Sequence, residues 1–279
     1  MVRNISKDIE VVAVIGAGYL GRQIIEKTAL KNYSLRIYDI NQEDLDKYTE
    51  KIAQIKRVEK VKGVVSFHRT LEEAVKDADL IIEAIPEKLE MKRQVFSQID
   101  KAAPPHAILA TNSSSIPVSK IEDVVKRKDK VLNIHFYHLF LQPMADIMRG
   151  TKTSDETFEK GKKWVENIEI TPLIVKKECF GFVFNRIWRA IKKESLKVWA
   201  GGHADIETID KAWKIYTGME LGPFELMDNI GLDVVYDIEM SYFKESNDPD
   251  DKPPQALKDM VDKGFLGRKS GKGFYDYTL

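Results

Sequence analysis

The stretch Val11-Val12-Ala13-Val14-Ile15-Gly16-Ala17-Gly18-Tyr19-Leu20-Gly21 decides the fold of the first half of this chain. Its five leading apolar residues show no polar alternation, which is typical of a strand buried on both faces of a parallel sheet. The three glycines have the spacing G-x-G-x-x-G and lead into an amphipathic stretch. We therefore predict a strand, a tight turn and a helix, in that order.

Each glycine of this motif has its own expected task. Gly16 permits the tight turn, Gly18 lets the backbone approach a pyrophosphate, and Gly21 lets the helix pack close to the strand. The pyrophosphate would lie at the helix N-terminus, where free N–H groups favour negative charge. Asp39 follows about 20 residues later, and its carboxylate would bind a ribose and repel a 2′-phosphate. The unit predicts a site for NAD rather than NADP; the competing interpretation is an ordinary glycine turn with a solvated aspartate.

Apolar runs and amphipathic stretches alternate over the first ~140 residues, which predicts an α/β fold with a doubly wound, Rossmann-type sheet. The predicted strands are Glu10–Ile15, Leu35–Asp39, Val64–Phe67, Leu80–Ala84, Ala107–Thr111 and Lys130–Phe136. The predicted helices between them are Leu20–Leu30, Asn41–Ile55, Thr70–Val75, Leu89–Ile99 and Val118–Val125.

The pattern changes in the second half. We expect a helix over Ser154–Ile168 and a last strand at Leu173–Val175. Helical periodicity then dominates, with one helix ending near Ala200, another capped by Asp205 and a third starting at Gly222-Pro223; no strand is expected before Phe274-Tyr275. We predict an NAD-binding domain over residues 1–178 and an all-helical domain over residues 179–279.

Composition narrows the classes of function. The 279 residues include 44 basic and 44 acidic side chains, and this zero balance argues against a nucleic-acid-binding protein. The single cysteine, Cys179, excludes an internal disulfide framework and a cysteine-rich metal site. The start of the chain is polar and no apolar run approaches the ~18 residues of a membrane helix, so we expect a soluble, cytoplasmic protein without membrane contact.

Polar side chains follow two of the predicted strands, at the edge where open α/β sheets bind ligands. The cluster Thr111-Asn112-Ser113-Ser114-Ser115 either holds a substrate hydroxyl or the nicotinamide amide, or caps the next helix. His135 ends the sixth strand and Asp146 follows it; a histidine with an acidic partner is the general acid/base unit of hydroxyl oxidation, although a structural histidine is the alternative. A zinc site at His135 and His138 lacks further ligands, so no metal is predicted.

In combination, the motifs resemble the NAD-dependent L-3-hydroxyacyl-CoA dehydrogenase family, which includes 3-hydroxybutyryl-CoA dehydrogenases. The resemblance covers nearly the whole chain and is highly specific for the family. It is carried by the glycine motif and by Glu83-Ala84-Ile85-Pro86-Glu87, the Thr111–Ser115 cluster, His135-Phe136-Tyr137, Gly181–Ile187, Gly222–Asp228, Gly231-Leu232-Asp233 and Gly267–Tyr275. It implies an acyl-CoA substrate, a place in fatty acid metabolism (β-oxidation), and a helical domain that forms a homodimer, with the active site in the cleft between the domains.

The resemblance also implies roles for single residues. His135 resembles the catalytic base that takes the proton from the 3-hydroxyl while a hydride leaves C3 for the nicotinamide. Ser114 resembles a serine that bonds substrate and cofactor, and Asn185 an asparagine that holds the reacting oxygen; a helix-face position is the alternative for Asn185. Asp146 stands where the family usually has glutamate, one methylene longer. The shorter residue either is brought closer by its loop or orients the histidine less well.

Three further residues resemble groups on the cofactor side of the cleft. They are Glu87, Lys92 and Lys269. Without the resemblance, both lysines would be expected to be solvated surface residues.

Two more departures concern the substrate. His138-Leu139 replaces the family's Asn-Pro after the catalytic histidine, so His138 either donates a hydrogen bond there or belongs to a rebuilt loop. The Asp39–Glu83 segment is short and lacks the helical pair that grips the CoA nucleotide. Its basic side chains either meet CoA phosphates or form a solvated face; they are Lys51, Lys56, Arg57, Lys60 and Lys62.

Three hypotheses remain open from the sequence. The leading one is an NAD-dependent dehydrogenase of a short-chain (3S)-3-hydroxyacyl-CoA such as 3-hydroxybutyryl-CoA. The second keeps the chemistry but takes a non-CoA 3-hydroxy acid, as in the gulonate dehydrogenase relatives. The third is an NAD-binding relative with little catalysis.

Overall fold

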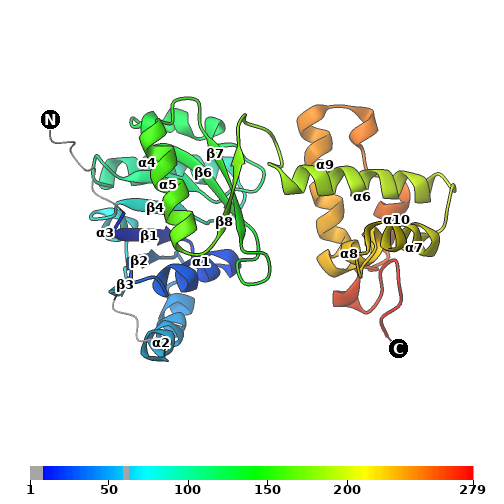
Figure 1. The fold of residues 1–279 in the computed structure, drawn as a ribbon, viewed down its shortest axis with the longest axis horizontal. Coiled ribbons are helices and arrows are strands. Elements are labelled where there is room, and N and C mark those ends of the chain that lie inside the picture. The colour runs from blue at the N-terminus through cyan, green and yellow to red at the C-terminus, as the bar shows by residue number, and fades with distance from the viewer. Residues whose placement is uncertain (1–8, 59–62, 279) are drawn as a thin grey trace. The chain divides into compact units, whose positions relative to one another are not determined.

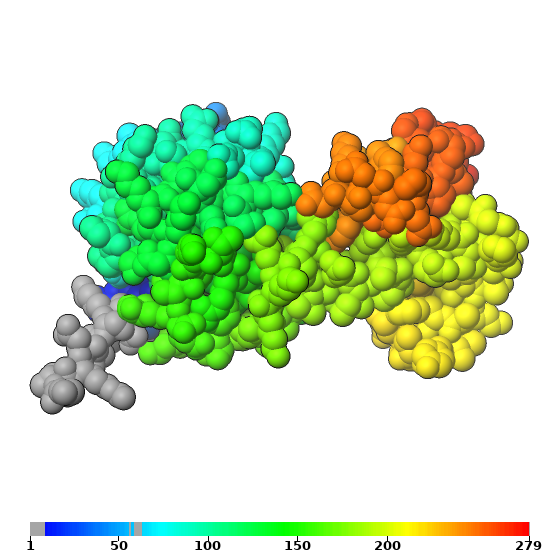
Figure 2. Space-filling model, turned by 90° about the horizontal axis from the view of Figure 1, so that it is seen from above, coloured from blue at the N-terminus to red at the C-terminus, as the bar shows by residue number. Residues whose placement is uncertain are grey.

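The computed structural model describes residues 9–58 and 63–278, coloured in Figure 1. The chain divides into two compact units, Met1–Val183 and Phe184–Leu279. Each unit is closely packed (Figure 2) and has a hydrophobic core of its own. In the part that the structure describes, no helix combines the length and apolarity needed to cross a bilayer.

Unit 1 is built on an eight-stranded sheet with the order β3-β2-β1-β4-β5-β6-β7-β8. Its strands are β1 (Val11–Ile15), β2 (Ser34–Tyr38), β3 (Val65–Phe67), β4 (Leu80–Glu83), β5 (Ile108–Thr111), β6 (Val131–Phe136), β7 (Met144–Arg149) and β8 (Thr171–Val175). The first six strands are mutually parallel, β7 is antiparallel to β6, and β8 is parallel to β7. This confirms the predicted doubly wound, Rossmann-type fold.

The strand order places the glycine-rich turn at a switch point of the sheet. β1 lies between β2 and β4, so the chain moves to one side of β1 first and to the other side later. Ile15, the last residue of β1, pairs with Tyr38 and with Glu83, the last residues of β2 and β4. The loops that follow these strands therefore start level with one another, and crevices at such points are where open α/β sheets bind ligands.

Helices cover both faces of this sheet (Figure 1). One face packs against α1 (Tyr19–Ala29), α2 (Gln42–Val58) and α5 (Asp155–Asn167). The other packs against α3 (Leu71–Val75), α4 (Leu89–Ala102) and the 3₁₀ turns η1 (Val118–Lys120) and η2 (Glu122–Val124); a third such turn, η3 (Lys128–Lys130), precedes β6. Burial on both faces explains why the strands read as continuous apolar runs.

One prediction for unit 1 was wrong, and one strand was missed. Val118–Val125 is not an α-helix but two 3₁₀ turns, closed by bonds such as Ile121 N–H to Val118 O. Its apolar face is buried as expected, but the segment is rich in β-branched residues, which favour helices weakly. The strand β7 was not predicted, because Asp146 interrupts its apolar pattern and Pro143 stands directly before it.

Unit 2 consists of helices, turns and two isolated antiparallel β-bridges over its described residues, 184–278. The helices are α6 (Phe184–Ala200), α7 (Ile206–Thr217), α8 (Pro223–Ile230), α9 (Leu232–Ser246) and α10 (Gln255–Asp262), with 3₁₀ turns η4 (Pro249–Asp251) and η5 (Arg268–Ser270). Asp205 caps α7 as predicted, accepting from Thr208 N at 2.7 Å. The strand expected at Phe274-Tyr275 is absent, because both N–H groups donate to the Asp228 carboxylate, each at 2.9 Å.

Candidate active site

The glycine-rich turn after β1 leaves open space where a dinucleotide pyrophosphate would lie. Gly16 has a φ of +102°, and a Cβ on Gly21 would lie 2.0 Å from Gly16 O, so both positions require glycine. A Cβ on Gly18 would meet nothing within 4 Å. Gly18 is also the N-cap of α1 and gives it no side-chain cap, which leaves the N-terminal N–H groups for an anion.

Asp39 ties this turn to the end of β2. Its Oδ2 accepts from Ala17 N at 2.6 Å and its Oδ1 from Asn41 N at 2.8 Å. The carboxylate is therefore held in place at the edge of the turn, and each oxygen retains lone pairs for a ribose hydroxyl. The turn and Asp39 together fit the adenosine and pyrophosphate of NAD.

A groove of about 560 Å³ opens beside the turn. It is lined by Gly18, Tyr19, Arg22, Gln23, Glu26, Lys51, His138 and Phe140. Lys51 pairs with Glu26 at 2.6 Å, while Lys60 and Lys62 of the predicted basic stretch lie outside the described residues. His138 lies in the turn after β6: its Nδ1 accepts from Leu141 N at 3.1 Å, and Leu139 N donates to Gln23 of α1 at 2.9 Å.

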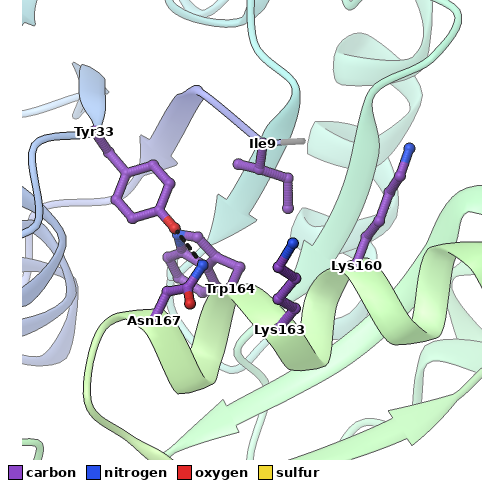
Figure 3. Close-up of a pocket in the computed structure, with 6 residues that line it drawn as sticks. All are labelled: Ile9, Tyr33, Lys160, Lys163, Trp164 and Asn167. Atoms are coloured by element: carbon purple, nitrogen blue, oxygen red, sulfur yellow. Dashed lines mark hydrogen bonds between the residues drawn. The ribbon is translucent and has the colours of Figure 1, made fainter. Parts of the chain in front are cut away.

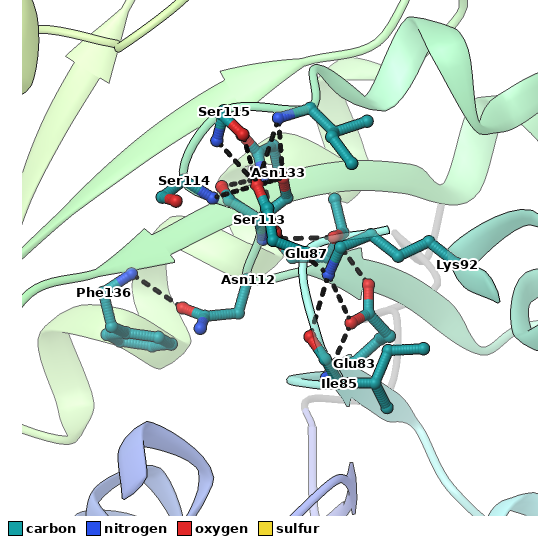
Figure 4. Close-up of polar contacts among 12 residues, drawn as sticks. Glu83, Ile85, Glu87, Lys92, Asn112, Ser113, Ser114, Ser115, Asn133 and Phe136 are labelled. Atoms are coloured by element: carbon teal, nitrogen blue, oxygen red, sulfur yellow. Dashed lines mark hydrogen bonds and ion pairs between the residues drawn. The ribbon is translucent and has the colours of Figure 1, made fainter. Parts of the chain in front are cut away.

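Beyond β4 the chain carries a buried ion pair (Figure 4). The Glu83 side chain is fully buried and accepts from Lys92 Nζ and Thr111 Oγ1, both at 2.7 Å, and from Ile85 N at 2.8 Å. Lys92 is 1% exposed, so the expectation of a solvated lysine was wrong: the first turns of α4 pack against the sheet and bring its ammonium group over Glu83. Lys92 also lies 3.4 Å from Glu87 Oε2.

Glu87 accepts hydrogen bonds from the serine cluster that follows β5 (Figure 4). Its Oε1 accepts from Ser113 Oγ, from Ser115 Oγ at 2.7 Å and from Ser115 N at 2.8 Å. Burial alone would raise the pKa of Glu87, but the Lys92 charge and these hydrogen bonds hold it below its ordinary value. Ser114 is exposed and gives Glu87 only its backbone N–H, at 3.1 Å, so its hydroxyl is the one that faces outward.

Two asparagines fix the serine cluster to β6. Asn133 Nδ2 donates to Thr111 O at 2.8 Å and to Ser113 O at 3.3 Å. Asn112 Oδ1 accepts from Phe136 N at 2.9 Å. Sequence reasoning missed Glu83 and Asn133 as members of this network, although both are polar residues inside otherwise apolar strands, which is a signal for buried hydrogen bonding.

His135 and Asp146 lie opposite each other on β6 and β7. His135 Nδ1 is 3.3 Å from Asp146 Oδ2, and the side chains are 7% and 0% exposed. Phe182 stacks on the imidazole with centroids 4.9 Å apart, and Tyr137 approaches it edge-on at 4.6 Å. The contact between histidine and acid is thus made despite the shorter aspartate, because antiparallel pairing places the two residues side by side.

The remaining predicted residues belong to unit 2. Asn185 is partly buried in the first turn of α6. Lys269 forms an ion pair with Asp233 at 2.5 Å and is 46% exposed. The structure therefore gathers the glycine turn, Asp39, Glu87, Lys92, Ser114, His135 and Asp146 in unit 1, and places Asn185 and Lys269 in the other unit.

A further pocket of unit 1, about 190 Å³, contains none of the predicted residues (Figure 3). It lies at the amino end of β1 and is lined by Ile9, Tyr33, Lys160, Lys163, Trp164 and Asn167. Across residues 9–58 and 63–278, the structure shows no group of three histidine, cysteine or acidic side chains placed to hold a metal ion.

Comparisons with known proteins match both units of the chain. The family described as 3-hydroxyacyl-CoA dehydrogenase, NAD binding domain, matches residues 11–179, and its C-terminal domain matches residues 181–277. A probable 3-hydroxybutyryl-CoA dehydrogenase of Bacillus subtilis is 35% identical over 283 residues, covering 97% of this chain and 98% of the relative. The solved structure of (S)-3-hydroxybutyryl-CoA dehydrogenase from Ralstonia eutropha is 28% identical, with a TM-score of 0.85 over 98% of this chain and 100% of the other. A diketoreductase of dicarbonyl compounds is 35% identical, with a TM-score of 0.86 over 97% and 100%.

Proposed function

Because this chain belongs to the 3-hydroxyacyl-CoA dehydrogenase family and carries its NAD-binding domain, we propose that it interconverts a short-chain (3S)-3-hydroxyacyl-CoA and its 3-oxo form. The substrate we propose is 3-hydroxybutyryl-CoA, the substrate in the names of two of the relatives above. The single observation that carries the proposal is the buried His135–Asp146 pair at the carboxyl end of β6, on the same sheet edge as the glycine-rich turn.

In the proposed mechanism, His135 is the general base. Asp146 faces Nδ1, which fixes the tautomer and leaves Nε2 for the proton of the 3-hydroxyl. The glycine-rich turn and Asp39 would hold NAD, which would supply the acceptor for the hydride from C3. As the oxygen–hydrogen bond breaks, the proton passes to His135 Nε2, and the Asp146 charge stabilises the imidazolium that forms.

The other site residues bind and orient. We assign the outward hydroxyl of Ser114 and the amide of Asn185 to the reacting oxygen, and Asp39 to the adenosine ribose. Glu87 would order the loop beside the nicotinamide, since three donors of the serine cluster fix it. Lys92 would act through Glu83 and Glu87 because it is buried between them, whereas Lys269 keeps an exposed position from which to meet the cofactor.

For the CoA moiety we propose the groove beside the glycine-rich turn. Arg22, Lys51 and His138 bring three basic side chains to it, and Glu26 is the acidic residue among those that line it. Such a surface favours phosphate groups. In this proposal, the groove between α1, α2 and the turn after β6 binds the CoA phosphates that the longer helical segment binds in the family.

The proposal is tested by following NADH absorbance with purified protein. We expect oxidation of NADH with acetoacetyl-CoA, a slower reaction with the same acyl group on a truncated thioester, and loss of turnover in His135→Gln. Turnover of free 3-oxo acids or simple diketones alone would move the protein to a non-CoA substrate. An intact rate in His135→Gln would contradict the mechanism, and silence with every substrate while NADH still binds would contradict the activity.

We further propose that residues 1–178 bind NAD and that residues 179–279 contribute to substrate binding and form a cytoplasmic homodimer. A groove of about 660 Å³ between α6 and α7 supports the dimer, because its lining is mostly apolar. The apolar lining residues are Ala190, Ile191, Val198, Ala204, Ile209, Ala212, Trp213, Tyr216 and Pro223.

A further inference from the structure

Asp146 is a fully buried carboxylate that needs more than its histidine to hold it. The side chain is 0% exposed, and among the described residues its Oδ1 is buried without a hydrogen-bond donor. An ionised carboxylate in such surroundings is costly unless donors stabilise it. The His135 contact, at 3.3 Å, is at the long end for an N–H···O bond.

Tyr137 supplies the closer donor. Its hydroxyl lies 2.6 Å from Asp146 Oδ2, the same oxygen that faces His135 Nδ1. A 2.6 Å O–H···O⁻ contact is in the range of charge-assisted hydrogen bonds. Tyr137 follows β6 directly, and its N–H donates to Met144 O at 3.3 Å, so the start of β7 fixes its backbone.

The tyrosine ring also holds the imidazole. The rings of His135 and Tyr137 meet at 65° with centroids 4.6 Å apart, while Phe182 stacks on the imidazole at an interplanar angle of 11°. Tyr137 thus contacts both members of the pair. The titratable groups in this cluster are His135, Tyr137, Asp146 and Cys179, whose thiol packs beside Phe182; β8 contributes the apolar Leu173 opposite Asp146.

From this geometry we propose that Tyr137 is a positioning residue for the dehydrogenase reaction, an inference that rests on the proposed role of His135. Its hydroxyl holds Oδ2 toward Nδ1, which leaves Nε2 available to the substrate.

The test compares Tyr137→Phe with the wild-type enzyme, using acetoacetyl-CoA and NADH. We expect kcat to fall about tenfold, the size of effect of one lost hydrogen bond to a charged group, with the KM for NADH unchanged. In this direction His135 donates its proton to the 3-oxo oxygen, so kcat/KM falls at alkaline pH as the imidazole loses that proton. In Tyr137→Phe the fall should reach half the maximum at a higher pH, because Asp146 without its tyrosine donor pairs more strongly with the protonated imidazole. Tyr33→Phe, which removes a hydroxyl bonded to Asn167 in the same unit, is the control and should leave both quantities unchanged.

A double-mutant cycle shows whether Tyr137 acts through Asp146. In an Asp146→Asn background, Tyr137→Phe should cost less than twofold, since the charge it stabilises is gone. An equal loss in both backgrounds, or an unchanged pH profile in Tyr137→Phe, would overturn the inference.

A failure of the proposed function is distinguishable from a failure of this inference. If none of the substrates tested supports NADH oxidation by the wild-type protein, the proposed function is wrong. The role of Tyr137 is then tested by NMR, which follows the ring signals of His135 after their assignment with His135→Gln. They should titrate at a higher pH in Tyr137→Phe, and identical curves would overturn the role of Tyr137.

Discussion

The side chains of Lys92 and Glu83 are 1% and 0% exposed, and their charges are 2.7 Å apart. Removing one member leaves the other buried without its counter-charge, which typically costs ~3–5 kcal/mol. We therefore expect Lys92→Met to lower the free energy of unfolding by about 3 kcal/mol, measured by urea unfolding followed by circular dichroism.

Lys269 provides the matched control for this prediction. It pairs with Asp233 at 2.5 Å but is 46% exposed, and such surface pairs contribute ~0–1 kcal/mol. The double variant Glu83→Gln/Lys92→Met should recover part of the loss, because it removes both charges, keeps one acceptor oxygen for Ile85 N and gives Thr111 Oγ1 an amide N–H donor. Equal effects of Lys92→Met and Lys269→Met would show that burial of the pair does not govern its contribution.

Glu87 predicts a pH dependence of stability. Burial would raise its pKa, but the Lys92 charge and the serine donors lower it below the ordinary value of 4.5. A carboxyl whose pKa is lower in the folded state stabilises the fold above its unfolded pKa and loses that effect as the pH falls through the folded value. The urea midpoint of the wild type should therefore exceed that of Glu87→Gln at pH 7, and the difference should shrink below about pH 4.5.

The exposed Glu156 provides the control for the urea-unfolding measurement on Glu87. Lys160 likewise lowers the pKa of Glu156, through a hydrogen bond on the surface of α5. Because solvent screens that pair, Glu156→Gln should change the urea midpoint less than Glu87→Gln at pH 7. A difference between wild type and Glu87→Gln that stays constant down to low pH would contradict the assignment of the effect to the Glu87 charge.

At the scale of elements, two glycines in the turn between β1 and α1 allow effects on folding to be distinguished from effects on cofactor binding. A Cβ at position 21 would lie 2.0 Å from Gly16 O, so Gly21→Ala must push α1 away from β1 and lower both the melting temperature and NADH affinity. A Cβ at position 18 meets nothing within 4 Å, so Gly18→Ala should keep the melting temperature of the protein alone. Its methyl group would still occupy space expected for the pyrophosphate and weaken NADH binding.

Thermal melts without NADH, together with NADH fluorescence titrations, check this pair of variants. Equal melting temperatures for Gly21→Ala and the wild type would refute the packing argument. Unchanged NADH affinity in Gly18→Ala would place the pyrophosphate elsewhere.

Elements were predictable where one local pattern determined them. The parallel strands and α1 follow from apolar runs and a glycine motif, and Asp205 marked the start of α7. β7 was not predictable in this way, since it is held by its neighbours β6 and β8 and contains the buried Asp146. The strand predicted at Phe274-Tyr275 was wrong for a related reason. The hydrogen-bond partner of both residues is the side chain of Asp228 in α8, which is distant in sequence.

At the scale of the whole molecule, the sequence indicated which residues lie together at one edge of the sheet better than how they contact one another. His135, Asp146, Glu87 and Ser114 were named from motifs, and they do lie in the loops and strands at one edge of the sheet. The burial of Lys92 and the hydrogen bond from Tyr137 to Asp146 depend on helix packing and on strand register, which no local pattern encodes.

Unit 2 carries the last prediction, which concerns assembly. Its α6 and α7 expose large apolar side chains: Ile187 is 57%, Ile215 75% and Tyr216 93% exposed. Tyr216 also lines the apolar groove between α6 and α7, and a second copy of this chain would cover such a surface. We expect the 32.0 kDa chain to sediment at twice that mass, and the double variant Ile187→Glu/Tyr216→Glu to sediment as a monomer, because two buried charges per chain oppose an apolar interface.

Val64→Glu, at another exposed apolar residue in unit 1, is the control and should remain dimeric. A wild-type protein that sediments as a monomer at micromolar concentration would contradict the proposed assembly, and a dimer that survives the double variant would place the interface on another surface.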